Sequence, residues 1–272
     1  MRMTALSCPF AYRDLLTASL MGYTAGYTTA NTKVRFNTFG GMMTGNTVKL
    51  GITLQQGEYA WTGVYFACVL LFALGTIAAL YMLQRLGGPR SQRAFLIVFC
   101  ACFVIVDGVA LAVDDTPESY NIHASLVSSL AAFALGGQNL LSQKAGVVKA
   151  NTTFMTGNIQ KVAEAVWNAY NKRKAGGLKP AEQRAAVLLV VTWIAYVLGG
   201  VCGAAMASLI HFHWSLTPVA LLYATGMTSM LIEPPSKKAA APAPSVAPSD
   251  AAKSGDPQVL PTPQTAVAVV KQ

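Results

Sequence analysis

Six stretches of mostly apolar residues follow one another along the chain, each about one bilayer crossing in length. A helix needs about 20 such residues to cross a hydrocarbon core of roughly 30 Å, so the pattern predicts six membrane-spanning helices. The first is semipolar, because it carries Thr24, Thr28 and Thr29. The predicted spans run from Leu15 to Ala30, Tyr59 to Leu83, Ala94 to Val113, Ile122 to Leu141, Ala186 to Ile210 and Trp214 to Ile232.

The distribution of basic residues gives these spans an orientation. With six crossings, 17 of the 20 Lys and Arg residues fall on one side of the membrane, and the other side keeps only Lys33, Arg35 and Lys49. Basic residues are retained in cytoplasmic loops, so both termini are predicted to be cytoplasmic. The composition agrees with a membrane protein, since 53% of residues are hydrophobic, only 11% are charged and the mean hydropathy is +0.44.

The remaining composition argues against several other classes of protein. The net charge of +9 is explained by loops that orient the chain and meet anionic lipid, so no nucleic-acid partner is expected. Four of the five cysteines lie within predicted spans, and the three histidines form no convergent ligand set, so neither a metal nor another cofactor is predicted. Catalytic motifs are absent, which argues against an enzyme.

The chain divides into four regions. Residues 1–14 are predicted to form a cytoplasmic N-terminus, residues 15–120 a first three-helix unit and residues 121–233 a second one. Residues 234–272 are rich in Ala, Pro, Ser and Lys, a composition that buries too little apolar surface to offset the entropy of ordering. They are predicted to form a disordered cytoplasmic tail.

A tetrapeptide occurs twice: Met43-Thr44-Gly45-Asn46 returns as Met155-Thr156-Gly157-Asn158. Weaker matches keep the same order around it, pairing Gly26 with Gly136 and Gly75 with Gly203, which predicts an internal repeat. Each copy holds three spans, and an odd number inverts the second copy. The expected fold is an all-α integral membrane protein with six transmembrane helices, arranged as two inverted three-helix repeats that each carry a short motif-bearing helix.

The segments around the motifs, Phe36 to Leu54 and Ala150 to Trp167, are too polar or too glycine-rich for ordinary spans. They are predicted to be short helices entered through a turn that the motif Thr and Asn residues cap. If they re-enter the membrane from opposite faces, their N-terminal ends converge near its midplane. If they lie flat at the two interfaces, they flank the pathway instead, and the sequence leaves both arrangements open.

Eight residues form the candidate solute site. The hypothesis is that side chains of the motifs and of the fourth span donate and accept hydrogen bonds, while the two motif glycines allow close backbone approach. The alternatives are helix capping for the motif residues and interhelical hydrogen bonding for the fourth-span residues. The candidate residues are Thr44, Gly45, Asn46, Gln138, Asn139, Thr156, Gly157 and Asn158.

Asp107 is a carboxylate well inside a predicted span, the third. Charged residues within membranes are costly and commonly functional, so Asp107 is a candidate ion-coupling group. The alternative is that it pairs with a basic residue such as Lys33 or Arg35 and orients helices. Gly22-x-x-x-Gly26 and Gly199-x-x-x-Gly203 are small-residue patterns that predict close helix packing.

The motif pair resembles the YoaK family of multi-pass membrane proteins, whose activity is not established. The resemblance rests on residues 40–51, on Gly137-Gln138-Asn139 and on residues 152–158, and it covers roughly residues 10–232. It implies a six-helix membrane protein. Family members often have an Asp in the first helix where this chain has Thr24, which argues against a coupling role for the first helix here.

The pattern as a whole favours a transporter or channel for a small polar solute, because inverted repeats allow a central site to open to either side. The alternative is a non-transporting scaffold or sensor whose basic loop and tail recruit cytoplasmic partners. The expected partners are the lipid bilayer and the solute. The sequence leaves open whether the chain forms a homo-oligomer.

Overall fold

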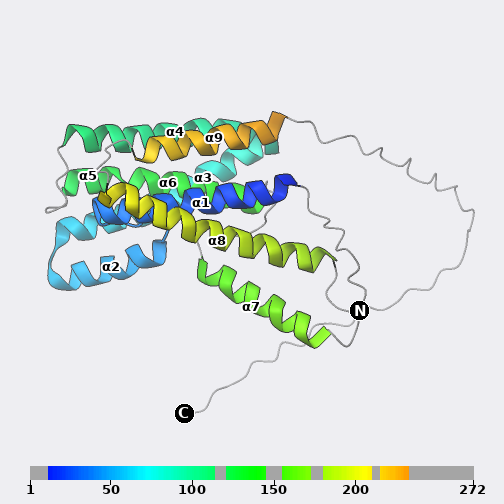
Figure 1. The fold of residues 1–272 in the computed structure, drawn as a ribbon. Coiled ribbons are helices and arrows are strands. Elements are labelled where there is room, and N and C mark those ends of the chain that lie inside the picture. The colour runs from blue at the N-terminus through cyan, green and yellow to red at the C-terminus, as the bar shows by residue number, and fades with distance from the viewer. Residues whose placement is uncertain (1–11, 114–120, 145–154, 173–179, 210–214, 233–272) are drawn as a thin grey trace, which may run out of the picture. The chain divides into compact units, whose positions relative to one another are not determined.

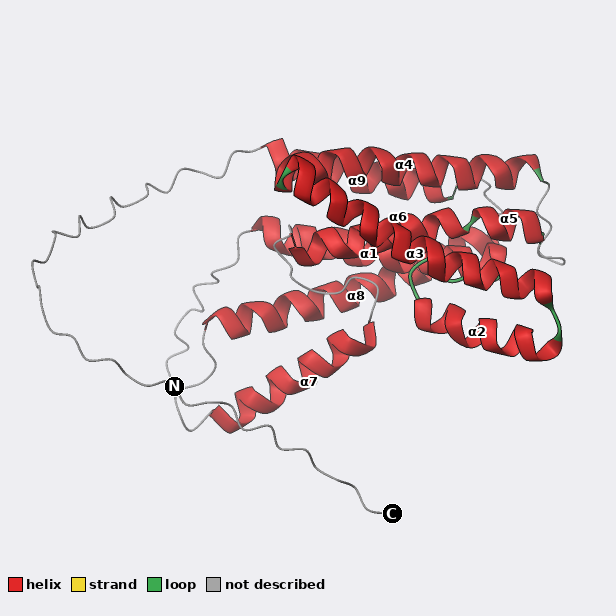
Figure 2. Ribbon diagram, turned by 180° about the vertical axis from the view of Figure 1, so that it is seen from behind, coloured by secondary structure: helices red, strands yellow, loops and turns green. Residues whose placement is uncertain are grey.

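The computed structural model describes residues 12–113, 121–144, 155–172, 180–209 and 215–232. This part of the chain is entirely helical and contains no strand (Figures 1 and 2). The predicted tail, residues 234–272, and the first eleven residues lie outside the described residues. The helices are α1 (Tyr12–Phe36), α2 (Met43–Gln56), α3 (Tyr59–Leu86), α4 (Gly88–Ala112), α5 (Ile122–Val127), α6 (Ser129–Lys144), α7 (Met155–Lys172), α8 (Pro180–Leu209) and α9 (Leu216–Ile232).

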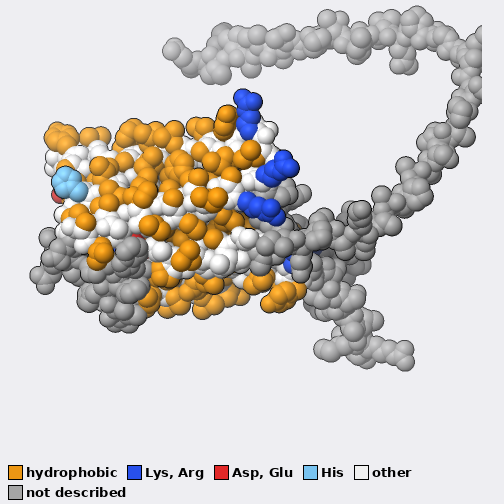
Figure 3. Space-filling model, turned by 90° about the horizontal axis from the view of Figure 1, so that it is seen from above, with side chains coloured by type: hydrophobic (Ala, Val, Ile, Leu, Met, Phe, Trp, Pro, Cys, Tyr) orange, Lys and Arg blue, Asp and Glu red, His pale blue; other side chains and the backbone are white. Residues whose placement is uncertain are grey.

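Four helical segments are long and apolar enough to cross a membrane: α3, α4, α8 and the α5–α6 pair. Large apolar side chains are exposed along α3 and α8, including Ile77 and Leu198. Figure 3 shows apolar side chains over most of the visible face, with Lys and Arg side chains gathered at one end of the helices. An apolar exterior of this extent is expected for a protein solvated by lipid.

The two remaining predicted spans are weaker candidates. Helix α9 is apolar but shorter, with an apolar segment over Leu216–Thr228. Helix α1 is not apolar enough to qualify by composition, because its polar residues lower its hydropathy. Most of α1 is buried among other helices, so its hydroxyl and amide groups are shielded from lipid.

Glycines bring α1 and α8 into backbone contact, as the small-residue patterns predict. A Cβ atom added to Gly26 would lie 2.0 Å from the carbonyl oxygen of Tyr196, and one added to Gly203 would lie 2.2 Å from that of Tyr27. The same close approach occurs at Gly22 and Gly199. Only residues without a side chain fit at such positions, and α1 packs more extensively against α8 than against any other helix.

A second seam of the same kind joins α3 and α6. A Cβ atom added to Gly75 would lie 1.9 Å from the carbonyl oxygen of Phe133, and one added to Gly136 would lie 2.2 Å from that of Phe72. Each seam therefore pairs a helix of one sequence half with a helix of the other.

The two seams correspond at two contacts. A shift of 110 positions takes α1 to α6, so Gly26 corresponds to Gly136, and a shift of 124 positions takes α3 to α8, so Gly75 corresponds to Gly199. Under these shifts both glycine contacts of the α3–α6 seam become glycine contacts of the α1–α8 seam, whereas Gly22 and Gly203 correspond to alanines. The sequence alignment paired Gly75 with Gly203, whereas the contacts favour Gly199, one helical turn earlier.

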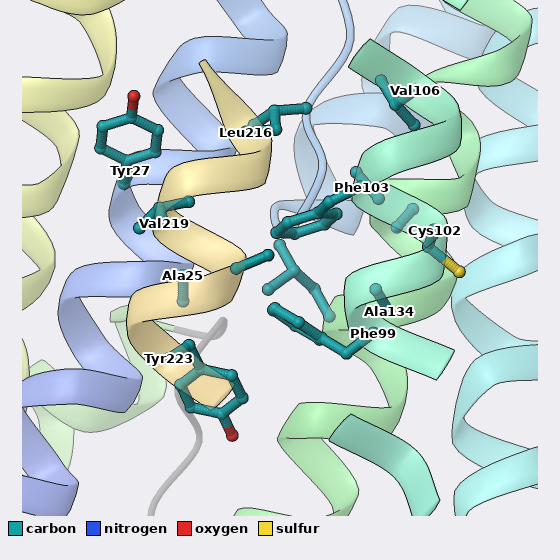
Figure 4. Packing of buried hydrophobic residues seen from close by; sticks show 14 of the residues in the cluster. Ala25, Tyr27, Phe99, Cys102, Phe103, Val106, Ala134, Leu216, Val219 and Tyr223 are labelled. Atoms are coloured by element: carbon teal, nitrogen blue, oxygen red, sulfur yellow. The ribbon is translucent and has the colours of Figure 1, made fainter. Parts of the chain in front are cut away.

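The apolar core lies between α1, α4, α6 and α9 (Figure 4). Its aromatic centre is Phe99, whose ring centroid lies 4.5 Å from that of Phe103 and 4.9 Å from that of Tyr223. Ala25 and Ala134 are completely buried beside these rings. Small residues on α1 and α6 thus leave room for the large ones on α4 and α9.

Candidate functional site

The segment after α1 folds back along that helix. Asn37 has a positive φ of 54°, a conformation that Asn tolerates better than most residues and that commonly ends helices. The N–H of Thr38 then donates to the carbonyl oxygen of Thr32, and the N–H of Gly40 donates to the Thr32 hydroxyl at 2.9 Å. Gly40 reaches Thr28, because a Cβ atom added to it would lie 3.3 Å from the Thr28 methyl group. Residues 37–42, called the re-entrant loop below, therefore pack against α1, and whether they re-enter a membrane stays a prediction.

Asn46 of the first motif holds this re-entrant loop closed. Its side-chain Oδ1 accepts from the N–H of Phe39 at 3.0 Å, and its Nδ2 donates to the Phe39 carbonyl oxygen at 2.7 Å. The Asn46 side chain is completely buried. Both ends of the amide are therefore engaged by the backbone of one residue, which gives Asn46 a structural role in this state.

Gly45 of the first motif lies against the Phe39 ring, and Thr44, among the described residues, does not form part of the loop contacts. Thr44 is exposed, and a Cβ atom added to Gly45 would lie 2.9 Å from the Phe39 ring, so only glycine allows the ring to pack there. The expected capping by motif residues is wrong for α2, because Met42 occupies the N-cap position and no side chain caps it. Thr44 and Asn46 instead lie within the first turn, where Asn46 reaches back to the loop.

Replacing Asn46 by alanine is expected to destabilise the loop and, if the protein takes up a solute, to leave that uptake unchanged. Both polar groups of the Phe39 backbone would lose their partners, which typically costs about 1–3 kcal/mol each when such groups are buried. Thermal unfolding in detergent measures the loss, and Thr44→Ala, at an exposed position, is the matched control. A variant with unchanged stability and lost uptake would instead place Asn46 on the solute.

The second motif begins its helix as the first one does. Helix α2 starts at Met43 and α7 starts at Met155, which are the first residues of the two tetrapeptides. Figures 1 and 2 place α2 and α7 toward opposite ends of the bundle. The side chains of Thr156, Gly157 and Asn158 lie outside the described residues, so their part in the candidate site stays a prediction.

The candidates of the fourth predicted span lie inside the bundle. Gln138 is buried, and its Nε2 donates to the carbonyl oxygen of Met21 on α1 at 3.3 Å, while its Oε1 has no partner. Asn139 is also buried, and its carbonyl oxygen accepts from the Ser142 hydroxyl. Gln138 therefore joins α6 to α1, as interhelical hydrogen bonding predicts, but keeps an unused acceptor.

Asp107 connects α4 to the ends of two other helices. Its Oδ1 lies 3.0 Å from a guanidinium nitrogen of Arg35, and its Oδ2 accepts from the N–H groups of Leu216 and Thr217 and from the Thr217 hydroxyl. The carboxylate thus occupies the N-terminal end of α9, where unpaired N–H groups and the helix dipole favour a negative charge. The contact matches the pairing alternative of the sequence analysis.

The network continues from Arg35 to α8. Arg35 donates to the Ser215 hydroxyl at 2.7 Å, and that hydroxyl donates to Oδ1 of Asn31 at 3.1 Å. Asn31 in turn donates to the carbonyl oxygen of Gly203, and the Tyr27 hydroxyl donates to the carbonyl oxygen of Ser215. Sequence reasoning missed Ser215, since the side chains that it bonds lie 180 and 184 positions away.

A second ion pair lies at the other end of α1. Asp14 is 4% exposed and pairs with the partly exposed Arg184 near the start of α8. Helix α1 begins at Tyr12, three residues before the predicted start of the first span at Leu15, and the cytoplasmic position of residues 1–14 stays a prediction. Among the described residues, no group of three or more His, Cys, Asp or Glu side chains is arranged to hold a metal ion.

This architecture defines an all-helical protein whose apolar helices suit multi-pass membrane insertion. The chain belongs to DUF1275, a family of proteins of unknown function, whose model matches residues 17–228. No curated protein and no solved structure matches it significantly.

Proposed function

We propose that this chain is a permease or channel for a small polar solute, built from two inverted repeats, residues 15–120 and 121–233, with six membrane crossings. Within DUF1275, the two motifs relate it to the YoaK proteins. The observation that carries the proposal is the correspondence of the α1–α8 seam with the α3–α6 seam under one pair of shifts along the sequence. Inverted repeats are the usual basis of alternating access.

Helix direction supports the inversion. In Figure 1, α1 and α6, which correspond under the shift of 110 positions, run in opposite directions along the bundle. The two motif helices each pack on the helix that follows them, α2 on α3 and α7 on α8. These paired relationships are those expected when a three-helix unit is duplicated and turned over in the membrane.

The charge distribution supports cytoplasmic termini. Arg85, Arg90 and Arg93 lie where α3 ends and α4 begins, and Lys144 ends α6 at the same end of the bundle. That end also contains the start of α1. By the positive-inside rule, the excess of basic residues at this end supports a cytoplasmic position for it. An even number of crossings then returns the C-terminus to the same side.

Cysteine accessibility tests the pathway without knowledge of the solute. Single cysteines at Thr28 and Gln138, in a background lacking the five native cysteines, are expected to react with a membrane-impermeant thiol reagent from at least one side. Ala110→Cys, at a buried core position of α4, is the matched control and is expected to stay unreactive. Protection of both test positions from both sides would contradict a pathway and favour the scaffold or sensor.

A further inference from the structure

Three buried oxygens between the central helices have no hydrogen-bond partner among the residues that the structure describes. They are the hydroxyls of Thr24 and Thr28 on α1 and Oε1 of Gln138 on α6. Thr24 and Thr28 are 0% exposed and Gln138 is 1% exposed. Buried polar atoms almost always find a partner, so three on one facing pair of helices need an explanation.

The two threonines differ from other helical threonines of the chain. Thr29 and Thr192 each donate to the carbonyl oxygen four residues earlier, at 2.7 Å, which is the common way to satisfy a hydroxyl inside a membrane helix. Thr24 and Thr28 make no such bond. Their hydroxyls are therefore free to bond another molecule, although a backbone carbonyl oxygen of their own helix lies one turn away.

Contacts between α1, α6 and the loop place these groups along one seam. Gln138 donates to the carbonyl oxygen of Met21, which lies one turn before Thr24 on α1. Thr28 lies one further turn along the same face. The Thr28 methyl group approaches Gly40 of the re-entrant loop, and so does the side chain of Leu135, three residues before Gln138 on α6. The loop, α1 and α6 thus meet around the unpartnered oxygens.

Repeat correspondence independently selects the same residues. The shift of 110 positions that takes Gly26 to Gly136 also takes Thr28 to Gln138. The two residues are therefore counterparts in the two halves, and each has an unpartnered oxygen. A binding site shared by two inverted halves is expected to be lined by counterpart residues from both halves.

We propose that Thr24, Thr28 and Gln138 form the binding site for an uncharged solute that offers both hydrogen-bond donors and acceptors, such as a small polyol or amide. This assignment rests on the proposed transport function. The three side chains are uncharged, and the buried charges of α1 are paired at its two ends, Asp14 with Arg184 and Arg35 with Asp107. An ion at the centre would lack a compensating charge.

Osmotic re-swelling of proteoliposomes tests the site and the class of solute. Vesicles holding the wild-type chain are mixed with hyperosmotic glycerol, urea or potassium chloride, and light scattering follows solute entry. Glycerol or urea is expected to enter faster than into protein-free vesicles, and potassium chloride is not. Thr28→Val and Gln138→Met are each expected to slow entry about tenfold, because each variant loses one hydrogen bond to the passing solute.

Ser125→Ala is the matched control, because the Ser125 hydroxyl is equally buried and unpartnered but lies on α5. It is expected to leave the entry rate unchanged. Thr28→Val and Ser125→Ala remove only an orphaned oxygen, so a purely structural role predicts equal or higher thermal stability and unchanged entry for both. Gln138→Met also removes the hydrogen bond to Met21, so a purely structural role predicts lower stability with unchanged entry. Unchanged entry in Thr28→Val and Gln138→Met would overturn the site and leave the transport proposal standing.

Two further outcomes separate the site from the function. Entry of potassium chloride but of neither neutral probe would overturn the solute class while supporting transport. Wild-type vesicles that match protein-free ones for every probe, with unreactive cysteines at positions 28 and 138, would overturn the site and the transport proposal together.

Discussion

Leucine in place of Gly26 is expected to separate α1 from α8 and to unfold the bundle at markedly lower temperature. The Cβ atom alone would lie 2.0 Å from the Tyr196 carbonyl oxygen, and the remaining leucine atoms would extend into the α8 backbone. Overpacking costs about 1–3 kcal/mol where side chains can move aside, and the cost here should reach at least ~3 kcal/mol, because the obstacle is backbone. The midpoint of thermal unfolding in detergent should fall by about 10 °C.

Gly63→Ala provides the control for that measurement. Gly63 lies in α3, and nothing lies within 4 Å of a Cβ atom built on it. The substitution should leave the protein as stable or raise its stability by up to ~1 kcal/mol, since alanine favours a helix more than glycine does. A Gly26→Leu variant that unfolds at the wild-type temperature would show that α1 and α8 do not make this contact.

Local patterns in the sequence predicted much of the fold. Four of the six apolar segments are confirmed as helices long and apolar enough to span a membrane, and the small-residue patterns of α1 and α8 correctly predicted close packing. Both features depend on residue type and spacing within one helix. The sequence could not show which helices the patterns join, since Gly26 meets Tyr196 far along the chain.

The candidate site was harder to predict, because it depends on which hydrogen bonds are left unmade. The motif singled out Asn46 as a solute-site candidate, which stays a prediction, and could not show its bonds to the Phe39 backbone, because the fold-back of the loop sets them. The sequence marked Thr24 and Thr28 only as polar positions in a semipolar span. Only the folded structure, which shows what surrounds each hydroxyl, reveals that both are unpartnered.

Alanine in place of Asp107 is expected to lower the stability of the protein as much as Gly26→Leu does, for an electrostatic reason. The change would leave the buried Arg35 guanidinium without its carboxylate and would remove the acceptor from the N–H groups of Leu216 and Thr217. Breaking a buried ion pair from one side typically costs about 3–5 kcal/mol. Thermal unfolding of the purified variant, compared with wild type, measures this loss.

The double variant Asp107→Ala, Arg35→Met separates the charge effect from the capping effect. With both charges gone, the penalty of the unpaired guanidinium disappears, so the double variant should be more stable than Asp107→Ala alone. The uncapped start of α9 remains in both, with an expected cost of about 1 kcal/mol. A double variant no more stable than the single one would show that capping, and not the ion pair, makes Asp107 important.

Asp107→Asn addresses the remaining hypothesis, that this carboxylate couples transport to an ion. The amide keeps the size of the side chain and an oxygen that can accept from the start of α9, so the fold should survive better than with alanine. Asp107 contacts Arg35 and the start of α9, and both contacts are structural. The variant is therefore expected to keep whatever pH or sodium dependence uptake has, and loss of that dependence in a folded Asp107→Asn protein would assign the coupling role to Asp107.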